Sequence, residues 1–315
     1  MGPADGPRRP PGRRPDRENQ APAIFVVGMP RSGTTLLRLM LDAHPELAIP
    51  AETHFLPDLV ELWERLEAGD APPAERARSA FELITCHPRW LELDIDADAL
   101  RAHLEACAPM GLADALRATG LVYAASRQKP RWGDKTPGYV VKMPLLQQAV
   151  PEARFVHVIR DGRDVALSLR PLSWGPGELD EIARRWSRRI KIARRDAERL
   201  APGSYTEVRY EDLVTRTERV LRELCDFLEL PFAPSMLEHH RDAAERMAPA
   251  LRDLNAGAAR TISAAERRLQ HSAAVTATRT DRVGRWRREM PPSDRREFES
   301  IAGPTLAELG YELEP

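Results

Sequence analysis

Short apolar runs along the chain alternate with stretches in which apolar residues recur every three or four positions. Residues 24–27 form the first run, which is rich in β-branched side chains and ends at Gly28. Such a run predicts a buried strand that enters a turn. Similar runs predict strands near 47–49, 155–159 and 205–209.

Helical spacing follows most of these runs. Leu36, Leu37 and Met40 share one face of a helix that begins near Thr34. Further helices are predicted up to Leu169, over 179–200, near 219–228 and before Gly310.

Strands that alternate with helices predict an α/β fold, here a P-loop-like parallel sheet flanked by helices. Residues from about 57 to 130 are helical in character, and we expect them to form a cap segment over the nucleotide core. Residues 131–137 are rich in turn formers and predict a loop. One domain is therefore expected over 23–315, preceded by a disordered Pro- and Arg-rich tail over 1–22.

Composition narrows the functional classes. A net charge of −1 over 315 residues argues against a globally basic nucleic-acid binder. The three cysteines, Cys86, Cys107 and Cys225, lack the spacing of a disulfide framework or a zinc site, so we expect no metal. No apolar stretch is long enough for a membrane span, and the N-terminus lacks the apolar core of a secretory signal, which favours a cytoplasmic protein.

The turn after the first strand has the spacing of a phosphate-binding loop. Residues 28–35 read GMPRSGTT and fit the pattern G-x-x-x-x-G-x-S/T between a strand and a helix. Backbone N–H groups of such a loop converge with the helix N-terminus on one anion. Thr34 stands where a Walker loop has its lysine, whereas Arg31 can bind one phosphate through two hydrogen bonds. A loop for a single phosphate, rather than a triphosphate, is the better interpretation.

The motifs beyond this loop resemble those of the PAPS-dependent sulfotransferase superfamily, nearest its tyrosylprotein sulfotransferase-like branch. PAPS is 3'-phosphoadenosine-5'-phosphosulfate, the sulfuryl donor. The resemblance covers most of the chain from Ile24 onward and is weakest between 54 and 131. It is carried by PRSGTTLLRLMLDAHPEL, AET, GDKTP, VHVIRDGRDVALSL, VRYEDLV, GRWRREM and LAELGYEL.

The resemblance implies a set of residues that bind PAPS. The 5'-phosphosulfate site would be made by Arg31, Ser32, Gly33, Thr34 and Thr35. The 3'-phosphate would be bound by Arg160 and Ser168, and further cofactor contacts would come from Tyr210 and Arg285. Arg160 also has independent support, because an arginine after a buried strand is a natural anion clamp.

Two residues carry the chemistry that the resemblance implies. Glu52 matches the general base that takes the proton from the acceptor hydroxyl. Lys135 matches the lysine that stabilises charge on the departing phosphate oxygen. Without the resemblance, Glu52 would be taken as a surface carboxylate and Lys135 as a solvated loop lysine.

The acceptor stays open between a tyrosine or other phenol, a sugar and another alcohol. His54 stands where the tyrosylprotein branch has an arginine, and no cysteine lies where its secretory members have disulfides. The basic residues between 184 and 195 either meet an acidic acceptor or form a solvated helix face, and the second is favoured. The sequence also leaves the oligomeric state open.

Two other functional classes compete with a sulfotransferase. A P-loop nucleotide kinase or NTPase would need a lysine at Thr34 and a magnesium-binding Asp after the 155–159 strand, where Arg160 stands first. A non-catalytic nucleotide-binding module would not need Glu52 and Lys135 beside the phosphate loop.

Overall fold

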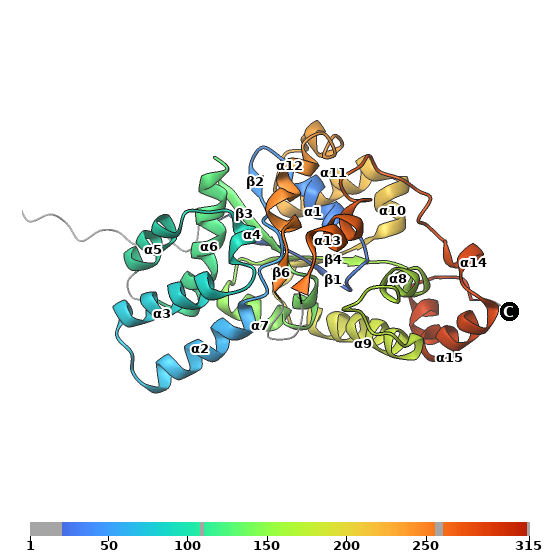
Figure 1. The fold of residues 1–315 in the computed structure, drawn as a ribbon, viewed down its shortest axis with the longest axis horizontal. Helices are drawn as coiled ribbons and strands as arrows, with labels where there is room; N and C mark the ends of the chain where they lie inside the picture. The colour runs from blue at the N-terminus through green and yellow to red at the C-terminus, as the bar shows by residue number, and fades with distance from the viewer. Residues whose placement is uncertain (1–20, 108–109, 256–260, 314–315) are drawn as a thin grey trace, which may run out of the picture.

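The computed structural model describes residues 21–107, 110–255 and 261–313 of the chain. A parallel sheet with the strand order β2-β3-β1-β4-β5 lies at its centre (Figure 1). The strands are β1 (Ile24–Gly28), β2 (Leu47–Ala48), β3 (Arg131–Lys135), β4 (Arg154–Ile159) and β5 (Tyr205–Arg209). The predicted α/β fold and its predicted strands are confirmed.

β1 is the central strand, and the chain builds the sheet outward on both of its sides. β2 and β3 lie on one side of β1, and β4 and β5 lie on the other. The carboxyl ends of β1, β3 and β4 therefore meet at one edge, where the strand order changes direction. Open α/β sheets bind their ligands at such an edge.

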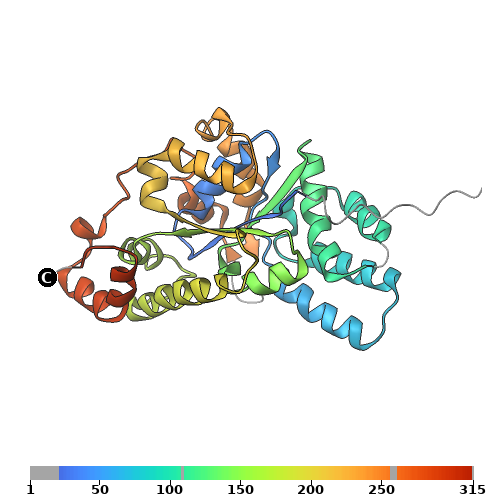
Figure 2. The same cartoon turned by 180° about the vertical axis from the view of Figure 1, so that it is seen from behind.

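Helices cover both faces of the sheet (Figures 1 and 2). Alternate residues of β1 point to opposite faces. Ile24 and Val26 pack in a core with α1 and α11, whereas Phe25 and Val27 pack in a core with α7 and α9. The flanking helices are α1 (Thr34–Asp42), η2 (Pro137–Val141), α7 (Met143–Ala149), α8 (Gly162–Leu169), α9 (Leu179–Ala197), α10 (Tyr210–Thr215), α11 (Thr217–Leu228) and α15 (Pro292–Glu308).

The segment predicted to be helical between 57 and 130 is helical. It lies beside the β2–β3 end of the sheet (Figure 1) and contributes Arg89 to the cavity described below. Its helices are α2 (Leu56–Ala68), α3 (Pro73–Cys86), α4 (Trp90–Leu93), α5 (Ala97–Ala106) and α6 (Leu112–Ser126).

The predicted loop over 131–137 is wrong, because most of it forms the buried strand β3. Its turn-forming residues serve close packing instead. A Cβ on Gly133 would lie 2.7 Å from the Ile24 carbonyl oxygen, so only glycine fits beside β1. The Trp132 ring lies directly against Gly120 of α6. Neighbouring elements rather than local propensity decide this strand.

Short elements lie between α11 and α15, and the end of α13 with the residues that follow it lies against the phosphate loop (Figure 1). The short elements are η3 (Pro234–Met236), α12 (Ala243–Met247), η4 (Ala248–Leu251), β6 (Leu254–Asn255), β7 (Thr261–Ile262), α13 (Ala264–His271) and α14 (Trp286–Glu289). Within the described residues, no helix has the length and apolar character needed to cross a bilayer. Of the predicted disordered tail, residues 1–20 lie outside the described part of the chain.

Candidate active site

The phosphate loop, residues 28–35, connects β1 to the N-terminus of α1. Gly33 has a φ of +98°, and a Cβ there would lie 2.4 Å from the Tyr210 ring. Both facts require glycine at this position. Arg31 also has a left-handed backbone, with a φ of +72°. Ser32 is buried, its hydroxyl has no partner among the described residues, and it lines neither of the two spaces described below.

One small cleft, the arginine cleft, opens beside this loop and has a volume of about 80 Å³. It brings together segments that are far apart in the sequence. Its walls are Arg31, Gly33, Thr34, Thr35, Leu36, Arg160, Ser168, Tyr210, Gln270, His271, Ala273, Ala274 and Arg282. The structure thus places nearly all the predicted cofactor residues together at the carboxyl edge of the sheet.

Arg160 is held in the arginine cleft by backbone carbonyl groups. Its Nη1 donates to the Arg31 carbonyl at 3.2 Å and its Nη2 to the Arg282 carbonyl at 2.6 Å. Its guanidinium lies over the Tyr210 ring, 4.4 Å from the centroid. Asp164 lies 3.6 Å away, and the buried Nε of Arg160 has no partner among the described residues. The guanidinium is oriented and retains an unused donor.

Arg31 and Ser168 meet from opposite sides of the same cleft. Arg31 Nε donates to Ser168 Oγ at 3.0 Å, and Arg31 Nη1 donates to the Gln270 carbonyl at 3.0 Å. Burial, and then the charges of Arg160 and Arg282, lower the pKa of Arg31 to about 10. Three cations gathered in this way form a site suited to an anion.

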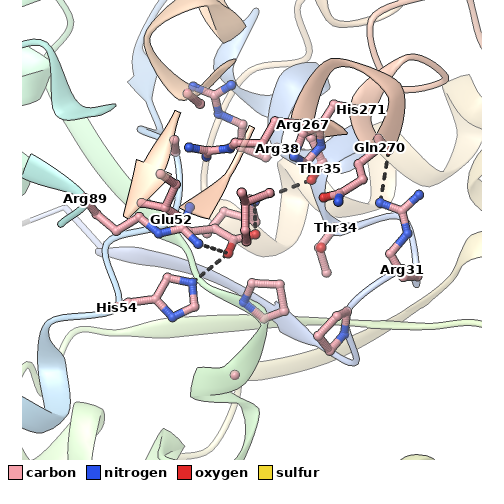
Figure 3. Close-up of a pocket in the computed structure, with 18 of the residues that line it drawn as sticks. Arg31, Thr34, Thr35, Arg38, Glu52, His54, Arg89, Arg267, Gln270 and His271 are labelled. Atoms are coloured by element: carbon pink, nitrogen blue, oxygen red, sulfur yellow. Dashed lines mark hydrogen bonds and ion pairs between the residues drawn. The ribbon is translucent and has the colours of Figure 1, made fainter. Parts of the chain in front are cut away.

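A larger cavity, the glutamate cavity, adjoins the arginine cleft and has a volume of about 370 Å³. The two spaces share the wall residues Arg31, Thr34, Thr35, Gln270 and His271. The remaining walls are Pro30, Arg38, Ala51, Glu52, His54, Arg89, Lys135, Pro137, Gly138, Trp174, Arg189, Met247, Ala250, Leu254, Ile262 and Arg267. Figure 3 shows Glu52, His54 and Arg89 together on one side of this cavity.

Glu52 and Lys135 form an ion pair beside the shared wall. Lys135 Nζ lies 2.7 Å from Glu52 Oε1 and 3.4 Å from Thr35 Oγ1. His54 Nε2 lies 2.6 Å from Glu52 Oε2. Burial opposes ionisation of Glu52, but Lys135 and His54 together hold its pKa well below the usual value. Glu52 is therefore a carboxylate at neutral pH, placed next to the phosphate loop.

A hydrogen-bonded frame fixes the loop that carries Glu52. Thr53 donates from Oγ1 to Asp134 Oδ2 at 2.7 Å and from its backbone N to Thr136 Oγ1 at 3.1 Å. Tyr139 contributes its hydroxyl, 3.1 Å from Thr53 Oγ1. Burial raises the pKa of Asp134 to about 6. Because Asp134 and Lys135 are consecutive in β3, this frame sets the distance between Glu52 and Lys135.

His271 lines both the arginine cleft and the glutamate cavity. Its ring has no hydrogen-bond partner among the described residues. Burial and then the charge of Lys135 lower the pKa of His271 to about 3, so its imidazole is neutral. Neither His271 nor the other residues from α13 and the 247–254 segment belong to a motif. Arg89, Arg267, Gln270 and Arg282 reach the two spaces only through the fold. Sequence reasoning therefore missed them.

Arg285 does not line either space. Its Nε donates to Glu289 Oε1 at 3.0 Å, one turn further along the chain. Arg282 occupies the wall of the arginine cleft instead. Contact between Arg285 and a cofactor stays a prediction.

The basic helix α9 pairs some of its arginines with carboxylates of the same helix. Arg184 and Arg185 pair with Asp180 and Glu181, one turn earlier. This arrangement fits the interpretation of a solvated face. Arg189 differs from these residues, because it lines the glutamate cavity.

Comparison with known proteins gives a consistent result. Residues 22–234 match the sequence model described as "Sulfotransferase family", and residues 185–310 match the one described as "Sulfotransferase domain". Protein-tyrosine sulfotransferase 1 of Homo sapiens is 26% identical over 296 residues, which are 92% of this chain and 70% of that protein. Protein-tyrosine sulfotransferase A of Caenorhabditis elegans is 25% identical over 300 residues, 93% of this chain and 68% of that protein.

Solved structures share the fold. The sulfotransferase domain from the Synechococcus PCC 7002 olefin synthase superposes with a TM-score of 0.61 at 23% identity, covering 96% of this chain and 99% of that one. The sulfotransferase domain from the curacin biosynthetic pathway gives a TM-score of 0.58 at 23% identity, covering 94% and 99%.

Proposed function

Because the chain belongs to the sulfotransferase family, in its tyrosylprotein sulfotransferase-like branch, we propose that it transfers a sulfuryl group from PAPS to a hydroxyl group held in the glutamate cavity. The observation that carries this proposal is the position of the Glu52–Lys135 pair. It lies at the wall that separates the arginine cleft from the glutamate cavity, within reach of Thr35. A proton acceptor and a cation thus stand where two bound substrates would meet.

The arginine cleft has the positive charge and the donors to bind the phosphate groups of a nucleotide. Arg31 meets a hydroxyl and a carbonyl oxygen there, so its positive charge is left for a ligand. Arg160 meets two carbonyl oxygens and has one carboxylate, Asp164, 3.6 Å away. The free donors of Ser32 Oγ and Arg160 Nε have the chemistry of anion ligands. We assign the 5'-phosphosulfate to the loop of Arg31 to Thr35 and the 3'-phosphate to Arg160 and Ser168. When bound, PAPS supplies the sulfuryl group together with a phosphate leaving group.

Glu52 acts as the general base in this proposal. Its carboxylate lines the glutamate cavity and accepts the proton of the acceptor hydroxyl. The ion pair with Lys135 makes Glu52 a weak base, as its low pKa indicates. The negative charge of a bound cofactor in the arginine cleft would draw Lys135 away from Glu52. The carboxylate of Glu52 would then become a stronger base. Lys135 then stabilises the charge that develops on the departing oxygen.

We propose a phenol as the acceptor, with tyrosine as the first example. The curated relatives are protein-tyrosine sulfotransferases. Trp174, Pro137, Met247 and Ile262 give the glutamate cavity an apolar wall that suits a flat ring. The hydroxyl of such a ring would face Glu52.

Calorimetry with nucleotides tests the proposed donor. The purified chain should bind 3'-phosphoadenosine-5'-phosphate at least about tenfold more tightly than ATP, because one charge-assisted hydrogen bond contributes about 1.5–3 kcal/mol. Magnesium should not reverse this preference. ATP binding that is equal or tighter in the presence of magnesium would contradict the proposal and support an NTPase. A screen of phenols, sugars and alcohols with radiolabelled PAPS then tests the acceptor.

A further inference from the structure

We propose that Glu92 is a positioning residue for the catalytic carboxylate, because it holds the guanidinium of Arg89 back from Glu52. Glu92 itself touches neither Glu52 nor Lys135 in any contact of the described residues. Its effect would pass through Arg89, which lies between the two carboxylates. This inference rests on the proposed role of Glu52 as the general base.

Glu92 is a buried carboxylate with two arginine partners. Arg89 Nη1 donates to both of its oxygens, at 3.2 Å and 3.1 Å. Arg267 Nη1 donates to Glu92 Oε1 at 2.8 Å. The side chain of Glu92 is only 4% exposed, so water competes little for these contacts. Glu92 therefore fixes one end of the Arg89 guanidinium from α4, while α13 supplies Arg267.

The other end of Arg89 stops short of the catalytic carboxylate. Arg89 Nη2 lies 3.9 Å from Glu52 Oε2, which is too far for a hydrogen bond. Each oxygen of Glu52 already has one close partner, Lys135 at 2.7 Å and His54 at 2.6 Å. The remaining lone pairs of Glu52 are the ones that an acceptor hydroxyl needs. Figure 3 shows Arg89, Glu52 and His54 in this arrangement.

Loss of the Glu92 charge would release Arg89. Arginine stays charged at any working pH, so a freed guanidinium seeks the nearest carboxylate. That carboxylate is Glu52, and a direct hydrogen bond from Arg89 would occupy a lone pair and lower its basicity. Burial already opposes the charge of Glu52, and Lys135, His54 and, from 3.9 Å, Arg89 already hold its pKa low. A direct hydrogen bond from Arg89, in addition to those with Lys135 and His54, would leave Glu52 a poor proton acceptor.

A purely structural role is the competing explanation. The pairs of Glu92 with Arg89 and Arg267 join α4 to α13, and their loss would also loosen the walls of the cavity. A loosened cavity slows all acceptors alike. A weakened base slows an acceptor in proportion to how much it needs proton removal. The dependence on acceptor acidity therefore separates the two explanations.

The test compares Glu92→Gln with the wild-type chain, with PAPS as donor and two phenols as acceptors. We expect kcat to fall at least tenfold with 4-methylphenol but less than threefold with 4-nitrophenol, which is partly ionised at neutral pH. Binding of 3'-phosphoadenosine-5'-phosphate should change less than twofold. Glu152→Gln is the matched control, because Glu152 also binds an arginine, Arg117 at 2.7 Å, away from both spaces. It should not alter the ratio between the phenols.

A second variant tests the route through Arg89. In the double variant Arg89→Gln/Glu92→Gln the Arg89 guanidinium is gone, so turnover of 4-methylphenol should recover at least fivefold over Glu92→Gln. Glu92→Asp keeps the negative charge and replaces Glu92→Gln in the test if that variant does not fold. It should show a smaller loss of turnover with the same dependence on acceptor acidity. Equal losses for both phenols, or a double variant no better than Glu92→Gln, would overturn the inference. Absence of transfer by the wild-type chain would instead contradict the proposed function.

Discussion

The arginine cleft and the glutamate cavity share a wall, yet the cationic side chains that line them have different partners. In the arginine cleft, Arg31 bonds to a hydroxyl and a carbonyl oxygen, and Arg160 bonds to two carbonyl oxygens with the carboxylate of Asp164 3.6 Å away. In the glutamate cavity, Lys135 and Arg89 bond to the carboxylates Glu52 and Glu92. The first space keeps positive charge for an arriving anion. The second space uses positive charge to keep the carboxylate of Glu52 ionised.

Replacement of the base should have the largest effect. Glu52→Gln keeps the shape of the side chain and removes most of its basicity, and loss of a general base typically costs about a hundred- to ten-thousandfold in rate. We expect transfer to a high-pKa alcohol or phenol to slow at least a hundredfold, while cofactor binding stays almost normal. Steady-state kinetics and calorimetry on the same preparation measure both. Near-normal turnover would exclude Glu52 as the base and make His54 the next candidate.

Replacement of one cation in each space should separate binding from turnover. Arg160→Ala should weaken the affinity for 3'-phosphoadenosine-5'-phosphate by about ten- to a hundredfold, since it removes charge-assisted contacts of about 1.5–3 kcal/mol.

Lys135→Ala should lower kcat far more than it lowers this affinity, because the charge of Lys135 matters most as the leaving oxygen becomes anionic. Thermal unfolding of both variants controls for loss of structure. An unchanged affinity in Arg160→Ala would refute the 3'-phosphate assignment.

The same two spaces differ in how far the sequence predicts them. The arginine cleft is built mainly from residues that follow predicted strands: the loop after β1 and Arg160 after β4. Local spacing and strand pattern suffice for these residues, since parallel strands bring their carboxyl ends to one edge. The wall formed by residues 270–282 was not predicted. The general features of the fold, the sheet and its flanking helices, were predictable for the same reason.

The glutamate cavity was predictable only in part. Glu52 and Lys135 follow from resemblance, but Arg89 and Arg267 come from α-helical segments whose approach depends on tertiary packing. The strand β3 was missed because Gly133 and Asp134 read as turn formers, although one fits against β1 and the other bonds to Thr53. Burial and partners at long range override the local signal in such segments.

The smallest effect concerns two arginines at the border of the arginine cleft. Arg282 lines the cleft, and its carbonyl oxygen accepts a hydrogen bond from Arg160. Arg285 bonds to Glu289 instead, and the sequence motif around it is the reason to expect a cofactor contact. The Arg31 pKa is lowered partly by the charge of Arg282, which places that charge near the anion site. We therefore expect Arg282→Ala to weaken binding of 3'-phosphoadenosine-5'-phosphate about three- to tenfold, because a peripheral charge contributes about 1 kcal/mol to binding.

Arg285→Ala should weaken the binding of this nucleotide less than Arg282→Ala does, because the Arg285 guanidinium must first leave Glu289. Glu289→Gln is the matched control: release of Arg285 from its partner should strengthen cofactor binding if Arg285 reaches the cofactor, and should leave it unchanged otherwise. A larger loss in Arg285→Ala than in Arg282→Ala would show that the 282–289 segment rearranges around the bound nucleotide, and that the cleft as described is its unliganded form.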